Sequence, residues 1–593
     1  MNILFSSRRT RDLLGVLVVF LLAACSGSPA GQADGSASLI LRGGNVITMD
    51  DTNPRAAAVV IADDRIVYVG SDEGADAWLN SATRVIDLAG ATVLPGLTDA
   101  HAHLMGTGRI KMRVNVLEST SFQELLDAVE AAVAEAEPGD WIVGRGWHQE
   151  KWTDQPETSV RGFPAHFELS AISPGNPVAI RHASGHGRLA NALALEAAGI
   201  TADTPDPFGG EILHLPNGQP SGMLLENAEN LVEDTYQEWL DARSPAERMA
   251  DERQALRLGI EEFLRNGITQ VQTPPANEYR GADEEEVALY RAAMEAGELK
   301  LRVWTMLDGR YATDEMLARL RTIGEGEHRL TVRAIKGYAD GALGSRGALL
   351  LEPYDDDPTL GEERLSRQRL EEIVELGLRH GYQVAIHAIG DGANRRVLDI
   401  YAEAFARHPE KSQDARFRIE HAQILHPDDV PRFAELGVTA AMQGIHSTSD
   451  GPWTPTRLGS QRSHDEAFPF RPLQESGALI VNGTDSPVER VSPFASMAGM
   501  TVGMMNNGDI FNPHHLLTRE QALAAYTINP AIAAFEEDLR GSIVVGKLAD
   551  FTITAEDPLS VPAERLAHTR VVMTIVGGEI VYSTEEFQPA GEF

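Results

Sequence analysis

The sequence of 593 residues contains a single cysteine, so no disulfide can form within the chain. It also contains few basic residues: 51 Lys and Arg stand against 87 Asp and Glu, which gives a formal net charge of −36. Because no run of Lys and Arg is long enough to form a basic stripe, nucleic acid is not an expected partner. The 54 Gly and 31 Pro follow no triplet period, which excludes a collagen-like chain.

The apolar run over residues 13–24 is shorter than the roughly 20 apolar residues that a membrane span needs. It follows three arginines and ends in LAAC, a pattern typical of a secretory signal. We therefore expect a signal peptide over residues 1–24. The pattern resembles a bacterial lipoprotein signal, which implies lipidation of Cys25, with residues 25–37 as a flexible tether. The expected location is the bacterial cell envelope, on the outer membrane facing the periplasm, with the lipid anchor as the only membrane contact.

Both ends of the remaining chain have the sequence pattern of short β-strands joined by turns. Apolar runs separated by Gly-Gly or Asp-Asp pairs extend from residue 39 to residue 70, and similar runs occupy residues 541–554 and 571–582. With 43% hydrophobic residues, the chain can bury a large core as well as smaller ones. We predict that residues 38–92 and 541–583 meet in one small β-sandwich.

Between these ends, apolar strand-like runs alternate with helical patterns, which is typical of a parallel α/β sheet. Helices are expected, for example, at Leu370–Arg379 and Ala393–Ala406. The predicted fold is a distorted (β/α)8 TIM barrel over residues 93–540, with an inserted subdomain at about residues 120–265 that has short strands of its own. The eight candidate strands are Val93–Asp99, Ile268–Thr273, Leu301–Leu307, Thr331–Tyr338, Gln383–Ala388, Phe417–His421, Val438–Gln443 and Ala478–Asn482.

Polar side chains that can bind a metal end several of these strands. His101 and His103 close the first strand and, being two residues apart, point to the same side. A His-X-His pair alone is equally compatible with ordinary buried or solvated histidines. The case is stronger because His387, His421 and Asp485 also end predicted strands, at the face where TIM barrels place their active sites.

Spacing along the chain supports this arrangement. His387 and His421 are 34 residues apart, close to the roughly 31 residues that one strand-helix unit occupies. Lys336 lies in the predicted fourth strand among apolar neighbours, where an unpaired ammonium group is costly to bury. It therefore needs a partner or a modification. Together these residues lie on strands one, four, five, six and eight.

Several motifs in this order resemble the amidohydrolase superfamily, and most closely amidohydrolase family 3, the YtcJ-like branch. They are PGLTDAHAH at 95–103, Lys336 followed by Asp340-Gly341, IHAIGD at 386–391, EHAQ at 420–423, GTDSPV at 483–488, TINPA at 527–531 and GSIVVGKLAD at 541–550. The resemblance extends over about residues 38–583. It implies one or two divalent metal ions, with zinc expected, and a carboxylated lysine. The implied metal ligands are His101, His103, Lys336, His387, His421 and Asp485.

The implied activity is hydrolysis of a non-peptide C–N bond in an amide, cyclic imide, formamide or related small molecule. A bound metal would lower the pKa of its water and polarise the substrate carbonyl. Asp485 is the expected catalytic base, and later the acid toward the leaving nitrogen. Two alternatives stay open: a hydrolytic deaminase of the same superfamily, and a solute-binding lipoprotein without turnover. The expected partner is a small-molecule substrate, and the sequence leaves room for a homodimer.

A second group of residues resembles family stretches near the substrate pocket, although packing or ordinary hydrogen bonding explains each of them equally well. Relatives commonly have an aspartate where this chain has His148, which leaves the identity of the substrate open. The predicted substrate-binding residues are Trp147, His186, Arg346, Gln443 and His446.

Overall fold

The computed structural model describes residues 37–116, 119–149, 152–182, 187–207, 210–275, 283–344 and 346–585. The predicted signal peptide, Cys25 and His186 lie outside these ranges. Within them, no helix combines the length and the apolar character that a membrane crossing requires.

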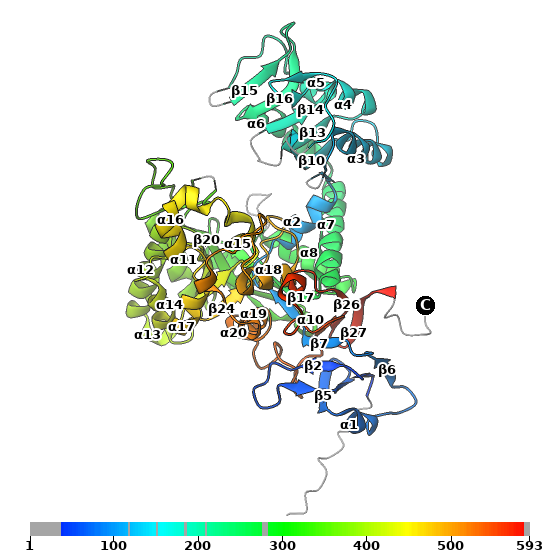
Figure 1. The fold of residues 1–593 in the computed structure, drawn as a ribbon, viewed down its shortest axis with the longest axis vertical. Coiled ribbons are helices and arrows are strands. Elements are labelled where there is room, and N and C mark those ends of the chain that lie inside the picture. Colours follow the sequence, from blue (N-terminus) through cyan, green and yellow to red (C-terminus); the bar gives the residue numbers. More distant parts are fainter. Residues whose placement is uncertain are drawn as a thin grey trace, which may run out of the picture. The chain divides into compact units, whose positions relative to one another are not determined.

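Eight parallel strands form one sheet that nearly closes into a barrel (Figure 1). The two edge strands meet where the amide of Ala100 donates to the carbonyl of Asn482 at 3.1 Å. The predicted TIM barrel is therefore confirmed. In spatial order the strands are β8 (Leu97–Asp99), β17 (Ile268–Thr273), β18 (Arg302–Asp308), β20 (Leu330–Tyr338), β21 (Gln383–Ala388), β22 (Arg418–His421), β23 (Thr439–Met442) and β24 (Ile480–Asn482).

Helices follow the strands and cover their outer faces. Helix α11 (Arg367–His380) begins where the hydroxyl of Ser366 accepts the amide of Arg369, and it ends at Gly381 with a φ of 69°. Strand residues such as Ile386 share a buried cluster with Ile373 of this helix. The other helices that follow barrel strands include α8 (Asp283–Glu295), α9 (Asp314–Leu320), α12 (Asp391–Arg407), α14 (Val430–Leu436) and α18 (Pro493–Thr501).

The predicted first strand, Val93–Asp99, is divided between two sheets. Its first half is β7 (Thr92–Pro95), which pairs with β2 (Asn45–Ile47) and β25 (Phe551–Thr554), and only β8 belongs to the barrel. Gly96 lies at the crossing, where a Cβ atom would come within 2.3 Å of the Thr269 hydroxyl oxygen. Pro95 and Gly96 interrupt the apolar run at this crossing, and a Pro-Gly pair is a sequence signal for such a break.

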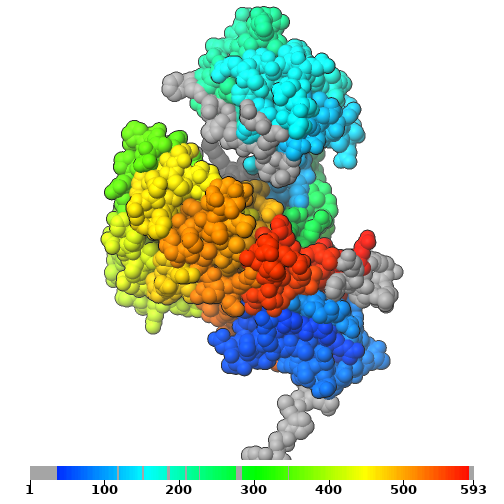
Figure 2. Space-filling view, viewed as in Figure 1, coloured from blue at the N-terminus to red at the C-terminus, as the bar shows by residue number. Residues whose placement is uncertain are grey.

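The chain ends form the expected β-sandwich. One sheet has the order β27-β26-β25-β7-β2-β3 and combines strands from both ends of the chain, whereas the other, β5-β4-β1-β6, comes from the N-terminal segment. In Figure 2 the blue N-terminal and red C-terminal segments lie against each other. The remaining strands are β1 (Leu39–Arg42), β3 (Arg55–Ala56), β4 (Ala58–Ala62), β5 (Arg65–Gly70), β6 (Arg84–Asp87), β26 (Val571–Val576) and β27 (Glu579–Ser583).

A buried ion pair joins this sandwich to the barrel. The guanidinium of Arg302, on β18, donates to both carboxylate oxygens of Asp550 at 2.7 and 2.8 Å. Asp550 also accepts the amide of Gly577 at 2.8 Å. Although burial alone would raise it, Arg302 holds the pKa of Asp550 below its ordinary value. Such a bidentate pair fixes the two parts of the fold in register.

The inserted segment contains a six-stranded sheet with the order β15-β16-β14-β13-β10-β9. It follows helix α2 (Leu104–Lys111), and the chain returns through α7 (Pro245–Arg265), which packs against α2. The sheet starts at Val114, a little before the predicted residue 120. Its strands are β9 (Val114–Asn115), β10 (Ile142–Trp147), β13 (Val178–His182), β14 (Gly187–Ala190), β15 (Gly210–His214) and β16 (Pro220–Glu226).

Replacing Gly96 with alanine should destabilise the protein by about 1–3 kcal/mol, because the added methyl group overlaps Thr269 and the Cβ of Asp550. Chemical denaturation measures this change. Gly175→Ala is the matched control, since its new Cβ would meet only a Pro138 carbon at 3.9 Å. Equal stability of the two variants would contradict the close approach at Gly96.

Candidate metal centre

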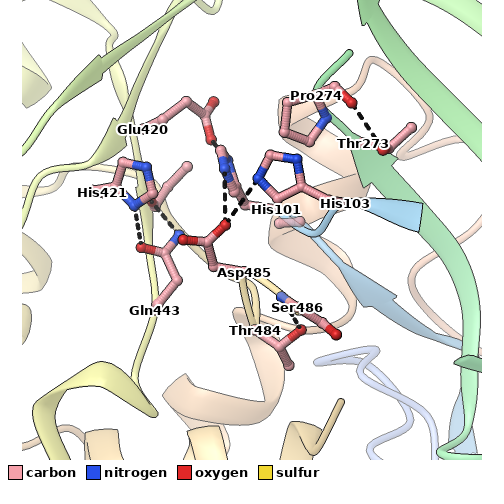
Figure 3. A network of polar contacts seen from close by, with 12 residues as sticks. His101, His103, Thr273, Pro274, Glu420, His421, Gln443, Thr484, Asp485 and Ser486 are labelled. Atoms are coloured by element: carbon pink, nitrogen blue, oxygen red, sulfur yellow. Dashed lines mark hydrogen bonds and ion pairs between the residues drawn. The ribbon is translucent and has the colours of Figure 1, made fainter. Parts of the chain in front are cut away.

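The histidines that follow β8 face the carboxylate that follows β24 (Figure 3). The Nε2 atom of His103 lies 3.2 Å from Oδ1 of Asp485, and Nε2 of His101 lies 3.6 Å from the same oxygen. The amide of Asp485 donates to the carbonyl of His101 at 2.7 Å, which holds the two chain segments together. These three side chains therefore point to one place.

Two further imidazoles extend this group. The ring of His421 lies 4.8 Å from that of His101, and the ring of His387 lies 4.4 Å from that of His421, measured between centroids. The Nδ1 atom of His421 is 2.8 Å from Oε1 of Gln443. All four histidines, together with Lys336 and Asp485, line one cavity of about 770 Å³. The structure therefore brings together all six predicted ligands.

Lys336 comes from β20 and is almost completely buried. Its Nζ atom lies 5.4 Å from the centre of the Tyr338 ring and has no hydrogen bond or ion pair in the described part of the chain. Burial lowers the pKa of Lys336 to about 8. An amine of this kind is less strongly protonated than an exposed lysine, which favours reaction as a nucleophile.

Burial keeps the imidazoles of His101, His387 and His421 neutral. Burial and the nearby charge of Lys336 lower the pKa of His101 to about 4 and that of His387 to about 3, and the pKa of His421 also falls well below its usual value. For Asp485, burial would raise the pKa, but the neighbouring His103 and the other imidazoles hold it well below its ordinary range. Neutral imidazoles and an ionised carboxylate are the forms that bind metals.

These residues fit a divalent cation. Two ligand atoms bound tetrahedrally to zinc at 2.0–2.1 Å are about 3.3 Å apart, and the observed separations from Asp485 Oδ1 are 3.2 and 3.6 Å. In addition, ligand atoms of His421, His446 and Asp485 lie within 4.8 Å of one another. The buried Nε2 atoms of His387 and His446 have no hydrogen-bond partner in the described residues, so both can accept a cation or a ligand.

Three buried carboxylates support this group without having been predicted to do so. Glu420 is hydrogen-bonded to Nδ1 of His101. Asp340 lies 3.6 Å from Nε2 of His387 and accepts three backbone amides. Asp99 accepts the hydroxyl of Thr484 at 2.6 Å. All three belong to the motifs that carry the family resemblance, which is the only signal in the sequence that singles them out.

Only one of the predicted substrate-binding residues named here lines the cavity. His446 lines the cavity, and Gln443 contacts it only through His421. Arg346 is bound to Asp356, at 2.8 Å between Nη2 and Oδ2, and is not part of the cavity wall. The predicted site residue His186 belongs to a segment outside the described residues.

Trp147 requires a correction, because it lies in the core of the inserted segment. Its side chain is fully buried, and its indole N–H donates to the carbonyl of Ile180 at 2.8 Å. The ring stacks on Trp152 with centroids 5.6 Å apart. The aromatic side chain on β10 fills the space between sheet and helices, and it does not line the cavity.

A parallel barrel with imidazoles and a carboxylate gathered at the carboxyl ends of its strands defines a TIM-barrel protein whose site has the ligand types that bind a divalent metal. Residues 84–582 match the Amidohydro_3 model, which describes the amidohydrolase family. The chain therefore belongs to the amidohydrolase family and is a hydrolase.

Three comparisons illustrate this membership. The chain is 31% identical to YtcJ of Bacillus subtilis (strain 168) over 551 residues, covering 92% of this chain and 99% of that protein. It is 29% identical to N-substituted formamide deformylase of Arthrobacter pascens, covering 92% and 98% of the two chains. A crystal structure of an uncharacterized metal-dependent hydrolase from Pyrococcus horikoshii OT3 is similar at a TM-score of 0.70 and 25% identity, covering 89% and 99%.

Trp147→Phe should lower the free energy of unfolding by about 2 kcal/mol, because the indole hydrogen bond and part of the packing are lost. Catalysis by the folded variant should be unchanged. Denaturant titration and steady-state kinetics test the two effects separately. A large rise in KM at unaltered stability would instead place Trp147 in contact with substrate.

Proposed function

We propose that this protein hydrolyses a non-peptide C–N bond of a small molecule, such as an amide, cyclic imide or formamide, with the help of one or two divalent metal ions, zinc being the expected one. The observation that carries this proposal is the convergence of four imidazoles, Lys336 and Asp485 in one cavity. The similarity to N-substituted formamide deformylase along almost the entire chain supports this bond type.

The residues that would hold the metal are His101, His103, Lys336, His387, His421 and Asp485. Carboxylation of Lys336 would turn a buried, unpaired cation into an anion that can bind two metals. When bound, a divalent metal lowers the pKa of water to about 7 and polarises a carbonyl group.

Asp485 is the residue suited to move the proton. Its carboxylate is ionised and faces the cavity beside two imidazoles. It can accept a proton from the attacking water and then pass it to the leaving nitrogen, so that the C–N bond breaks without releasing an unstable amide anion. His446 lines the same cavity, and its Nε2 atom has no hydrogen-bond partner among the residues that the structure describes, so it is placed to bind a polar group of the substrate.

Asp485→Asn should reduce kcat by about 10²- to 10⁴-fold, because the amide cannot accept the proton. Steady-state kinetics measure this loss.

The unsubstituted protein should contain one or two equivalents of metal, and chelation should abolish turnover of a panel of amides, imides and formamides. Metal analysis and product assays check both points. Turnover by metal-free protein would contradict the proposal, ammonia released from an amidine ring would indicate a deaminase, and binding without product would indicate a solute-binding protein.

We also propose that the protein is attached to the bacterial envelope through lipid on Cys25, facing the periplasm. The only cysteine of the chain follows the apolar run and stands directly after LAA. A lipid anchor would confine the hydrolase to the membrane surface without a membrane-spanning helix.

Cys25→Ala should move the protein from the membrane fraction to the soluble fraction, or leave its leader uncut, while the specific activity of the folded domain stays unchanged. Cell fractionation and intact-protein mass spectrometry measure this. An unsubstituted protein that carries no lipid would refute the anchor.

A further inference from the structure

The interior of the barrel contains an ion pair directly beneath the metal centre. Arg418 and Glu420 are two residues apart on β22 and therefore face the same side, toward the barrel interior, whereas Ile419 joins the outer cluster with the helices. Both charged side chains are fully buried. Barrel interiors of this class are filled mainly by branched apolar residues, and burying an ion pair costs several kcal/mol in desolvation. Packing alone therefore does not explain why an ion pair is buried at this place.

The contacts of Glu420 show what the pair does. Its Oε2 atom is hydrogen-bonded to Nδ1 of His101 and also accepts Nη2 of Arg418 at 3.3 Å. Its Oε1 atom lies 2.8 Å from Nε of Arg418. Because the Arg418 guanidinium lies against both of its oxygens, Glu420 is placed to accept a hydrogen bond from the imidazole, so the proton of the His101 ring is on Nδ1, the nitrogen that faces it.

Arg418 is itself fixed on the other sides. Its Nη2 atom donates to the carbonyl of Ala100 at 2.7 Å, next to His101 in sequence, and its Nη1 atom donates to Gln272. Its guanidinium also lies 5.5 Å from the centre of the Trp304 ring. The arginine thus contacts both the backbone that carries His101 and the carboxylate that binds its ring.

We propose that Glu420, held by Arg418, is the positioning residue that fixes the tautomer and orientation of His101 and thereby sets the metal affinity of the centre. With the proton on Nδ1, the lone pair of His101 Nε2 faces Oδ1 of Asp485 at 3.6 Å. Two acceptors at this distance repel each other unless a cation lies between them. This inference rests on the metal site of the proposed function.

The geometry explains why a carboxylate is required. Oε2 of Glu420 contacts both His101 and Arg418, and Oε1 lies against the Arg418 guanidinium, so glutamine, although equal in size, must turn its NH2 group toward His101 or toward that cation. Glu420→Gln should therefore weaken zinc binding by about 10- to 100-fold. Combining it with Arg418→Met should restore part of the affinity, because the amide oxygen can then turn toward His101 without a clash on the other side.

The experiment measures zinc affinity by competition with a chromophoric chelator, on the full chain and its variants. Glu229→Gln is the matched control: Glu229 is a buried partner of Arg181 in the inserted segment, so its loss should reduce stability and leave zinc affinity unchanged. Circular dichroism confirms folding of each variant. If the unsubstituted protein binds no zinc, the proposed function itself fails. If it binds zinc and Glu420→Gln binds equally well, the positioning role is refuted.

A second measurement needs no folded variant of Glu420. In the metal-free, unsubstituted protein, the ring ¹⁵N spectrum of labelled histidine should show His101 with hydrogen on Nδ1, assigned by its disappearance in His101→Gln. A His101 ring with hydrogen on Nε2 would overturn the proposal.

Discussion

The placement of a buried carboxylate among four imidazoles, two of them also buried, is the constraint on which the rest of this structure depends. Buried polar groups are costly unless they are paired, and Asp485 is only 6% exposed. The protein meets this cost by keeping the rings of His101, His387 and His421 neutral. It also places a further carboxylate against two of them, Glu420 at His101 and Asp340 at His387. Such an arrangement needs a rigid frame, because a shift of one strand would separate the ligands. A parallel barrel provides that frame, since the carboxyl ends of its strands all meet on one face.

The β-sandwich contributes to the same constraint. Strand β7 is hydrogen-bonded between β2 and β25, and after Gly96 the same segment continues as β8 and leads directly to His101. The first two imidazoles are therefore fixed by two sheets at once. The ion pair between Arg302 and Asp550 ties the sandwich to β18 as well. The strands from both chain ends contribute no side chain to the cavity. Their role is to hold the barrel strands that carry the ligands.

The sequence predicted the barrel well because seven of its strands are apolar runs bounded by polar residues, a signal that is local. The grouping of the six ligand residues was equally accessible, since each ends such a run or lies within one. The contacts that support these ligands could not be predicted from the sequence. Glu420 and His101 are 319 positions apart, and nothing in either segment specifies the other. The burial of Trp147 and the pairing of Arg346 with Asp356 likewise depend on tertiary packing, which the pattern along the chain does not encode.

The backbone conformation at two places next to the cavity also shapes the site. Neighbouring residues in an extended segment normally face opposite sides, yet Glu420 and His421 at the end of β22 both serve the same site, and so do Thr484 and Asp485, which follow β24. At both places the second residue adopts a positive φ, 78° at His421 and 55° at Asp485. Such conformations cost about 1–3 kcal/mol in residues other than glycine and persist only where the surroundings enforce them. Here each lets one side chain bind a supporting group while the next turns toward the cavity. The strain is therefore the means by which short strand ends supply both a ligand and its support.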